Sequence, residues 1–168
     1  METELTNGTI SLRPFTLADA HYHLTHEDEE TEKWLSGGKS TLECVTTWIE
    51  RNTESWAAGG PVFCFAVVDQ PDTLVGMVEA RPIDPNAFNT QEGDMNISYG
   101  IYPEARGKGY AVEAVKLLMQ FLKKLGHKRT IIRVNPQNVA SLSVPRKLGF
   151  EELNDESKDE LIAFGRVL

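Results

Sequence analysis

A short glycine-rich turn, Arg106-Gly107-Lys108-Gly109-Tyr110-Ala111, carries the residues best suited to hold a ligand. Its two glycines let the backbone approach a bound group closely, and successive backbone amides can then point into one small volume. The turn leads into a segment with helical periodicity, so the positive end of the helix dipole adds to those amides. These properties predict a binding site for a diphosphate group, with Arg106 and Lys108 as additional positive charges.

Two common phosphate-binding motifs do not fit the spacing of this turn. The dinucleotide-binding fingerprint requires a glycine at position 112, where this chain has Val112. The P-loop requires Ser or Thr directly after its Gly-Lys pair, where this chain has Gly109. A plain tight turn with surface cations is the alternative when the turn is considered alone.

The hydrophobic patterns around the turn predict alternating strands and helices. Strands are expected at 9–15, 62–68, 74–80, 94–102, 129–134 and 160–168, and helices at about 17–35, 40–58, 110–125 and 138–148. Ser40 and Glu43 fit a capping box at the start of the second helix, and Gly149 is placed for a left-handed cap at the end of the last. Residues 82–93 lack periodicity and predict a loop of the kind that often binds ligands.

The composition is that of an ordinary globular chain with a net negative charge. Among 168 residues, 17 are Lys or Arg and 25 are Asp or Glu, which gives a formal charge of −8. This balance argues against a general affinity for nucleic acid or an anionic membrane and is compatible with cationic partners. The sequence shows neither a membrane span nor the regions of a signal peptide. We expect one domain over residues 1–168, located in the cytoplasm.

Neither the cysteines nor the histidines form a metal-binding pattern. Cys44 and Cys64 lie 20 residues apart without a CxxC motif, and Cys64 belongs to an apolar run that is typical of a buried strand. His21, His23 and His26 fall in one predicted helix but, at about 100° per residue, do not converge on one point. We therefore expect no metal site.

Two motifs together resemble those of the GNAT superfamily, in particular the ribosomal-protein alanine N-acetyltransferases and their antibiotic-modifying relatives. In that family the pattern Arg/Gln-x-x-Gly-x-Gly/Ala binds the pyrophosphate of acetyl-CoA, and it is met here by Arg106, Gly109 and Ala111. The pattern Asn-x-x-Ser, ahead of a Lys-Leu-Gly-Phe helix end, is met by Asn138, Ser141 and residues 147–150. The two motifs at this separation favour the diphosphate site over a plain turn.

The resemblance implies an α/β fold with a twisted, mixed and mostly antiparallel sheet of about seven strands flanked by about four helices. The fourth and fifth strands, 94–102 and 129–134, would be parallel but splayed apart. The pantetheine arm of acetyl-CoA would lie in that opening along the backbone of the fourth strand. The residues implied in cofactor binding are Ile101, Tyr102, Arg106, Gly107, Lys108, Gly109, Tyr110, Ala111, Asn138, Ser141 and Arg146.

The resemblance leaves the proton-transfer groups open. Many family members carry a glutamate where this chain has Asn96, which cannot accept a proton, and other branches use a tyrosine in the last helix where this chain has Pro145. Ser141 is the candidate acid. Pro145 sharpens this choice, because it has no amide hydrogen for the carbonyl of Ser141 and leaves the turn there open. The candidate bases, acting through water, are Glu79, Asp94, Asp84 and Glu92. An ordinary helical serine and solvated carboxylates are the alternatives.

We therefore expect an acetyl-CoA-dependent N-acetyltransferase that works by direct transfer in a ternary complex, as a monomer or a homodimer. Its acceptor is a small cationic amine, such as an aminoglycoside-type antibiotic, or the N-terminal amine of a protein such as a ribosomal protein. The acidic segment 27–30 and the carboxylates near the presumed cleft favour the small amine. A CoA-binding sensor without catalysis is a third hypothesis.

Overall fold

The computed structural model describes residues 4–69, 71–85, 90–153 and 160–168. The strands are β1 (Leu5–Thr6), β2 (Ile10–Pro14), β3 (Phe63–Asp69), β4 (Thr73–Pro82), β5 (Met95–Ile101), β6 (Arg129–Val134), β7 (Glu151–Glu152) and β8 (Ile162–Val167). The helices are α1 (Ala20–His26), α2 (Glu29–Thr31), α3 (Leu42–Ala58), α4 (Tyr110–Lys124) and α5 (Val139–Lys147). Short helical turns are η1 (Leu17–Asp19), η2 (Glu32–Ser36) and η3 (Pro103–Ala105).

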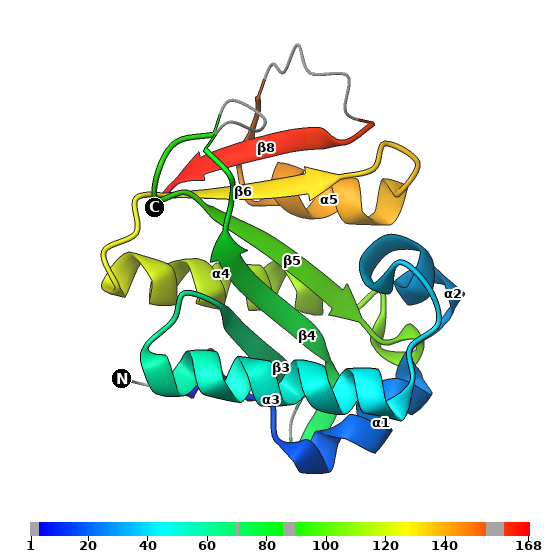
Figure 1. Cartoon of the computed structure of the whole chain (residues 1–168). Helices are drawn as coiled ribbons and strands as arrows, with labels where there is room; N and C mark the ends of the chain where they lie inside the picture. The colour runs from blue at the N-terminus through cyan, green and yellow to red at the C-terminus, as the bar shows by residue number, and fades with distance from the viewer. Residues whose placement is uncertain (1–3, 70, 86–89, 154–159) are drawn as a thin grey trace.

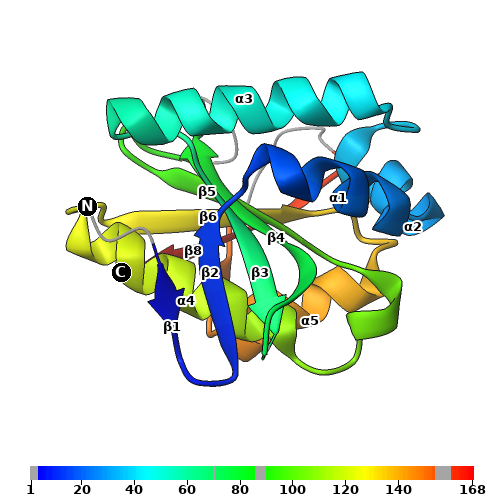
Figure 2. The same cartoon turned by 90° about the horizontal axis from the view of Figure 1, so that it is seen from below.

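The strands form one sheet in the order β1-β2-β3-β4-β5-β6-β8-β7. Neighbouring strands are antiparallel except β5 and β6, which run parallel. Helices α3 and α1 cover one face of the sheet and α4 covers the other (Figures 1 and 2). The expected α/β fold is confirmed. The described sheet has eight strands rather than about seven, because β1 and β7 have two residues each and are too short to produce a pattern.

The parallel strands β5 and β6 separate soon after they begin. Their register pairs Met95 with Thr130 and Asn96 with Ile131, and the strands then diverge across the face shown in Figure 1. The predicted splay is therefore confirmed. Beyond Asn96, the edge of β5 that faces β6 borders an opening, and this edge is available to a ligand.

Apolar side chains pack on both faces of the sheet and make it a rigid platform. Helical spacing places Leu118 and Leu122 of α4 in the core behind β5, and both are fully buried. On the other face, Ile49 of α3 packs over Cys64, which is buried as predicted. No helix within the described ranges is long and apolar enough to span a membrane.

The stretch from Leu17 to Ser36, expected to form one helix, is divided into η1, α1, α2 and η2. The break lies at Glu27, whose backbone is extended with φ −69° and ψ 138°. The Asp28 carboxylate then accepts a hydrogen bond from Thr31 N at 3.0 Å and starts α2. An acidic side chain that caps a new helix competes with continuation of the old one, so the single-helix expectation was wrong.

Two further helix ends test the predicted caps. Helix α3 is capped by Thr41, whose Oγ1 accepts from Cys44 N at 3.2 Å, so the expected cap at Ser40 is displaced by one residue. Gly149 follows α5 with φ +68°, as expected for a left-handed helix end.

Candidate active site

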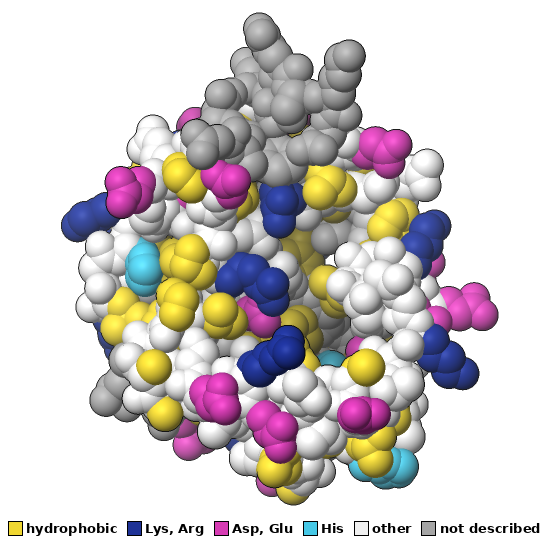
Figure 3. Space-filling view, in the orientation of Figure 1, with side chains coloured by type: hydrophobic (Ala, Val, Ile, Leu, Met, Phe, Trp, Pro, Cys, Tyr) yellow, Lys and Arg dark blue, Asp and Glu magenta, His cyan; other side chains and the backbone are white. Residues whose placement is uncertain are grey.

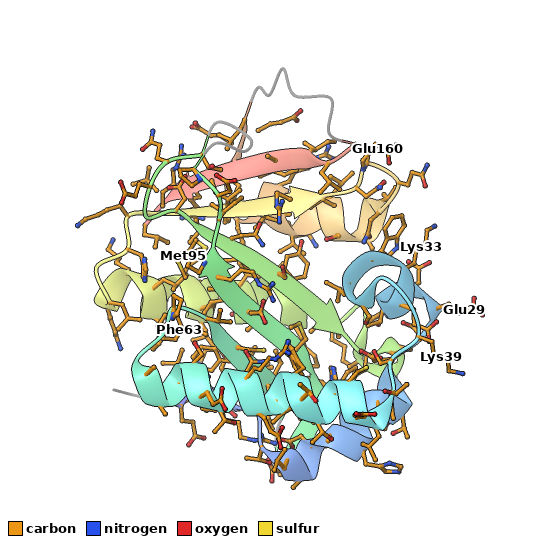
Figure 4. The ribbon with its side chains drawn as sticks, in the orientation of Figure 1. Glu29, Lys33, Lys39, Phe63, Met95 and Glu160 are labelled. Carbon is orange, nitrogen blue, oxygen red and sulfur yellow. The ribbon has the colours of Figure 1, made fainter. Side chains whose placement is uncertain are left out.

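A cavity of about 670 Å³ opens where β5 and β6 separate. Its walls come from β5, the turn before α4, the start of α5, and α2 with η2 on the opposite side. Figure 3 shows this face hollowed near its centre, with Lys and Arg side chains gathered beside the hollow. Figure 4 labels Met95, where β5 begins beside β6, and Lys33 of η2, which lines the cavity.

The backbone of β5 presents hydrogen-bonding groups to this cavity. Tyr102 N donates to Val75 O at 2.9 Å, and the register continues with Ile101 opposite Gly76 and Tyr99 opposite Val78. Because hydrogen-bonded and non-hydrogen-bonded pairs alternate in an antiparallel ladder, the N–H and C=O groups of Tyr99 and Ile101 point away from β4 and toward the opening. A strand-like ligand can therefore pair with them.

Tyr102 was expected to contact the cofactor, and the structure places it elsewhere. Its N–H donates to Val75 and its C=O accepts from Ala105 N at 2.9 Å, so both backbone groups are used within the protein. Its ring is buried under α1, where Tyr102 Oη lies 2.6 Å from His23 Nδ1. Burial raises the pKa of Tyr102 and lowers the pKa of His23. Ile101 lines the cavity and Tyr102 does not.

The glycine turn has the geometry of an anion site. Gly107 and Gly109 have φ of +79° and +82°, and Gly109 precedes the first residue of α4, whose first amides have no partner within the helix. A Cβ at either glycine would meet no atom within 4 Å, so both glycines face open space. Gly107, Gly109, Tyr110 and Ala111 all line the cavity. Lys108 does not, and its Nζ lies 5.7 Å from the centre of the Tyr110 ring.

The side chain of Arg106 is engaged with Asp28 of the opposite wall. Its Nη1 and Nη2 donate to the two Asp28 carboxylate oxygens at 2.7 and 2.8 Å, and its Nε donates to Ile101 O at 2.9 Å. The Arg106 guanidinium holds the pKa of Asp28 well below its usual range. Arg106, which was predicted to bind phosphate, is thus paired with a carboxylate in this structure. Arg106 nevertheless lines the cavity, whereas Arg146 does not.

Ser141 lies on the cavity wall at the start of α5, where its amide donates to Asn138 Oδ1 at 3.1 Å. Asn138 thus caps α5 as well as lining the cavity. Tyr99 Oη donates to the Ser141 carbonyl at 2.9 Å and lies 2.9 Å from Ser141 Oγ. The carbonyl that Pro145 was predicted to leave open is therefore bonded by Tyr99.

Tyr99 is the residue near the site that the sequence reasoning missed. Burial raises the pKa of Tyr99 to about 12, partly offset by its hydrogen bond to Ser141. Both contacts are satisfied when the Ser141 hydroxyl donates to Tyr99 Oη, because a phenol has one proton. The signal was present in the pattern: strand alternation places Tyr99 with Ile101, and the open carbonyl of Ser141 required a donor.

The candidate bases are separated by their surroundings. Glu79 is 3% exposed, pairs with Arg81, and lines a second cavity of about 300 Å³. Asp94 is also buried, but Arg129 Nε donates to its carboxylate at 3.0 Å and it lines neither cavity. Asp84 and Glu92 are exposed and line neither cavity. Of these four carboxylates, the structure brings only Glu79 to a cavity.

Asn96, at the position of the family base, contributes to the wall of the first cavity. Its Oδ1 accepts from Arg133 Nε at 3.1 Å and its Nδ2 donates to Ser98 Oγ at 3.3 Å. Ser98 lies opposite Glu79 in the β4–β5 register, so Glu79 is next to the strand that lines the first cavity. Asn96 is a polar wall residue in this arrangement, and it has no group that accepts a proton.

The second cavity adjoins the first, and its lining includes two glutamates together with His23 and Arg81. Thr31 and Leu35 line both cavities, and Glu27, Trp48 and Glu79 line the second. The Glu27 side chain is 7% exposed and lies 3.6 Å from His23 Nε2, and Glu27 Oε1 accepts from Ser36 Oγ at 3.2 Å. Two carboxylates thus meet in a small cavity beside the opening in the sheet. The described residues contain no group of three or more His, Cys, Asp or Glu side chains that could hold a metal ion.

Comparisons with known proteins place these features in a family. A model of the acetyltransferase (GNAT) domain matches residues 9–151. Mycothiol acetyltransferase of Rhodococcus erythropolis strain PR4 is 26% identical over 119 residues, which span 71% of this chain but only 38% of that protein.

Two solved structures share the fold. The ribosomal-protein-S5-alanine acetyltransferase of Vibrio fischeri aligns with a TM-score of 0.78 and 18% identity, covering 99% of this chain and 97% of the other. The microcin C7 self-immunity acetyltransferase MccE, solved with acetyl-CoA and AMP, aligns with a TM-score of 0.78 and 17% identity, covering 96% and 94%.

Proposed function

The chain belongs to the GNAT acetyltransferase family and is an acyltransferase that uses acetyl-CoA, and from this premise we propose that it acetylates a primary amine of a small cationic acceptor, such as an aminoglycoside-type antibiotic. The observation that carries the proposal is the pair of buried carboxylates, Glu27 and Glu79, in the cavity that adjoins the opening between β5 and β6. A cationic amine entering this cavity is attracted by Glu27 and competes with Arg81 for Glu79.

In this proposal acetyl-CoA occupies the larger cavity. Its diphosphate lies on the amides of the turn 107–111, and its pantetheine arm pairs with the backbone of Tyr99 and Ile101. An amide on the same edge of β5 that the pantetheine arm does not use stabilises the oxyanion that forms when the amine attacks the thioester, since it is fixed before the reaction begins. The amine comes from the smaller cavity, past Thr31 and Leu35, and the acetyl group moves directly within a ternary complex.

The attacking amine must be neutral, and its pKa decides how much help it needs. A lysine-type amine with a pKa near 10.4 is protonated at pH 7, and removing that proton costs about 4 kcal/mol, whereas an α-amine needs only about 1 kcal/mol. Glu79 is the carboxylate positioned to take this proton, directly or through water. Arg81 forms an ion pair with it.

Proton donation to the departing CoA thiolate is assigned to Ser141. Its hydroxyl turns from Tyr99 Oη, 2.9 Å away, toward the sulfur and gives it a proton, while Tyr99 stays bonded to the Ser141 carbonyl and orients Ser141 from behind. The nitrogen loses two protons: one goes to Glu79 before attack, and the second leaves the tetrahedral intermediate as the C–N bond is completed and the C–S bond breaks. The second proton balances the one delivered to sulfur, and Glu79 releases the first to solvent.

Replacing Ser141 with alanine is expected to lower kcat about tenfold to a hundredfold, because the thiolate loses its donor. The Kd for CoA, measured by calorimetry, is expected to stay within about twofold, since the phosphate turn is unchanged. Tyr99→Phe should give a smaller loss of kcat in the same direction. Full turnover in Ser141→Ala would return Ser141 to the role of an ordinary helical serine.

The acceptor class is tested by the release of free CoA thiol from acetyl-CoA with a panel of amines. We expect an aminoglycoside to be the better substrate than a peptide with a free N-terminal amine. Its KM should rise about tenfold between 50 and 300 mM salt, because ions in solution screen the attraction of the free polycation toward the carboxylates of the cavity. Glu27→Gln should flatten that dependence. A preference for the peptide, with KM independent of salt, would instead favour acetylation of a protein N-terminus.

The proposal treats residues 1–168 as one acetyltransferase domain that works in the cytoplasm, as a monomer or homodimer, without nucleic acid or membrane partners. The absence of a membrane-spanning helix among the described residues is compatible with this location.

A further inference from the structure

We infer that the Asp28–Arg106 ion pair positions the wall between the two cavities, and that Arg106 serves acetyl transfer through Asp28 rather than by binding the phosphates of the cofactor. The pair joins residues 78 positions apart, one on the phosphate turn and one at the start of α2. The inference rests on the proposed function for the placement of acetyl-CoA in the larger cavity and of the acceptor in the smaller one, whereas the ion pair and the wall are described independently of both.

Three of the five N–H groups of Arg106 are used inside the protein. Two form a parallel fork on the Asp28 carboxylate at 2.7 and 2.8 Å, and Nε donates to Ile101 O at 2.9 Å. This bidentate geometry is the strong form of the arginine–carboxylate contact. A guanidinium held in this way carries little net charge for a phosphate, so the amides of the glycine turn remain as the anion-binding groups.

Asp28 carries the contact onward to the wall. The same carboxylate accepts from Thr31 N at 3.0 Å and from Thr31 Oγ1 at 2.9 Å, and Thr31 lines both cavities. One carboxylate thus starts α2 and ties it to the phosphate turn. Glu30 and Glu104 add negative charge around Arg106 and strengthen its hold on this side.

The wall needs such an anchor because hydrophobic burial does not hold it. Neither α2 nor η2 contains a buried residue, whereas α4 contains eight. A second polar contact of this segment is the hydrogen bond of 3.2 Å from Ser36 Oγ to Glu27, at its far end. Polar contacts at its two ends therefore fix residues 28–36.

Leu35 shows what the anchored wall does. A Cβ at Gly100 would lie 2.6 Å from Leu35 Cδ1, so Leu35 rests directly on the backbone of β5 where that strand lacks a side chain. This is the strand along which the pantetheine arm would lie, and Leu35 lines both cavities. Breaking the ion pair between Asp28 and Arg106 therefore moves the Leu35 side chain, which lies where the acceptor and the thioester would meet.

Hydrogen exchange and CoA binding test the inference without any acceptor. Asp28→Asn removes the charge but retains a good helix cap, Arg106→Leu removes the fork, and Arg106→Lys restores only part of it. We expect Asp28→Asn and Arg106→Leu each to raise exchange across residues 29–36 about tenfold, and the double variant to add nothing further. Both single variants should weaken CoA binding by a similar factor, with Arg106→Lys intermediate.

The matched control is the ion pair of Arg13 and Asp19, which has the same fork at 2.8 and 2.8 Å and lines neither cavity. Asp19→Asn should leave both hydrogen exchange at residues 29–36 and the Kd for CoA unchanged.

Whether Asp28→Asn weakens or strengthens CoA binding decides between the two roles of Arg106, positioning the wall or binding phosphate. If Arg106 binds phosphate, freeing it from Asp28 strengthens CoA binding, and Arg106→Leu weakens it without changing exchange at 29–36. That result, or unchanged exchange in both variants, overturns the inference. Failure of the amine panel would leave these measurements intact.

Discussion

Replacing Gly109 with valine is expected to raise the KM for acetyl-CoA about a hundredfold while leaving a folded enzyme. The amides of the turn 107–111 are the proposed diphosphate ligands, and each hydrogen bond to a charged group contributes about 1.5–3 kcal/mol. A side chain at position 109 would project into the open space that the phosphates need, because no protein atom lies within 4 Å of its Cβ. Steady-state kinetics with varied acetyl-CoA, supported by calorimetric titration with CoA, measure the effect.

Gly126→Val is the matched control for Gly109→Val. Gly126 follows the opposite end of α4, has φ +91°, and likewise has no atom within 4 Å of an added Cβ. Both substitutions force valine into the left-handed region, which costs at least about 1–2 kcal/mol of folding free energy. Similar losses of stability in urea, with weakened cofactor binding only in the Gly109 variant, would support the assignment. An unchanged KM in the Gly109 variant would remove the phosphate site from this turn.

The contrast between Tyr99 and Arg106 shows how far the sequence could predict the site. Pro145 revealed an open carbonyl at Ser141 because the chemistry of proline is local, and the structure fills it with Tyr99. The partner of Arg106 could not be predicted in the same way. Asp28 is 78 residues away and lies in an acidic run that, by itself, is typical of a solvated face. The sequence shows that an arginine lies beside the predicted phosphate turn. Only the folded structure shows which carboxylate pairs with that arginine.

The helices and strands could likewise be predicted only where the sequence pattern is local. Periodic segments such as α4 and the hairpin of β3 and β4 were predicted, since each repeats one pattern over many residues. The break at Glu27 was not, because one capping contact between Asp28 and Thr31 decides it. The splay of β5 and β6 came from resemblance, since no pattern within either strand encodes the distance between them. The cavity depends on that distance.

Of the four carboxylates predicted as bases, Glu79 is the one that lines the proposed acceptor cavity. Replacing Glu79 with glutamine is expected to reduce kcat about a hundredfold with a lysine-type amine. The substitution preserves shape and leaves Arg81, whose side chain is 54% exposed and stays hydrated, so stability should change little. Glu27→Gln is the matched variant in the same cavity, and it should raise the acceptor KM with kcat nearly unchanged, because Glu27 attracts the cation without taking its proton.

The pKa of the acceptor distinguishes a base from a structural residue at position 79. A general base matters most when the proton is hard to remove, so the Glu79→Gln loss should be about tenfold smaller for an α-amine than for an amine with a pKa near 10.4. Turnover measured with both acceptors at one pH gives this ratio. A structural defect would lower both rates by the same factor, and equal losses would contradict the role of Glu79 as base. A loss that tracks acceptor pKa requires proton transfer at this carboxylate, because packing and charge attraction do not depend on how tightly the amine holds its proton.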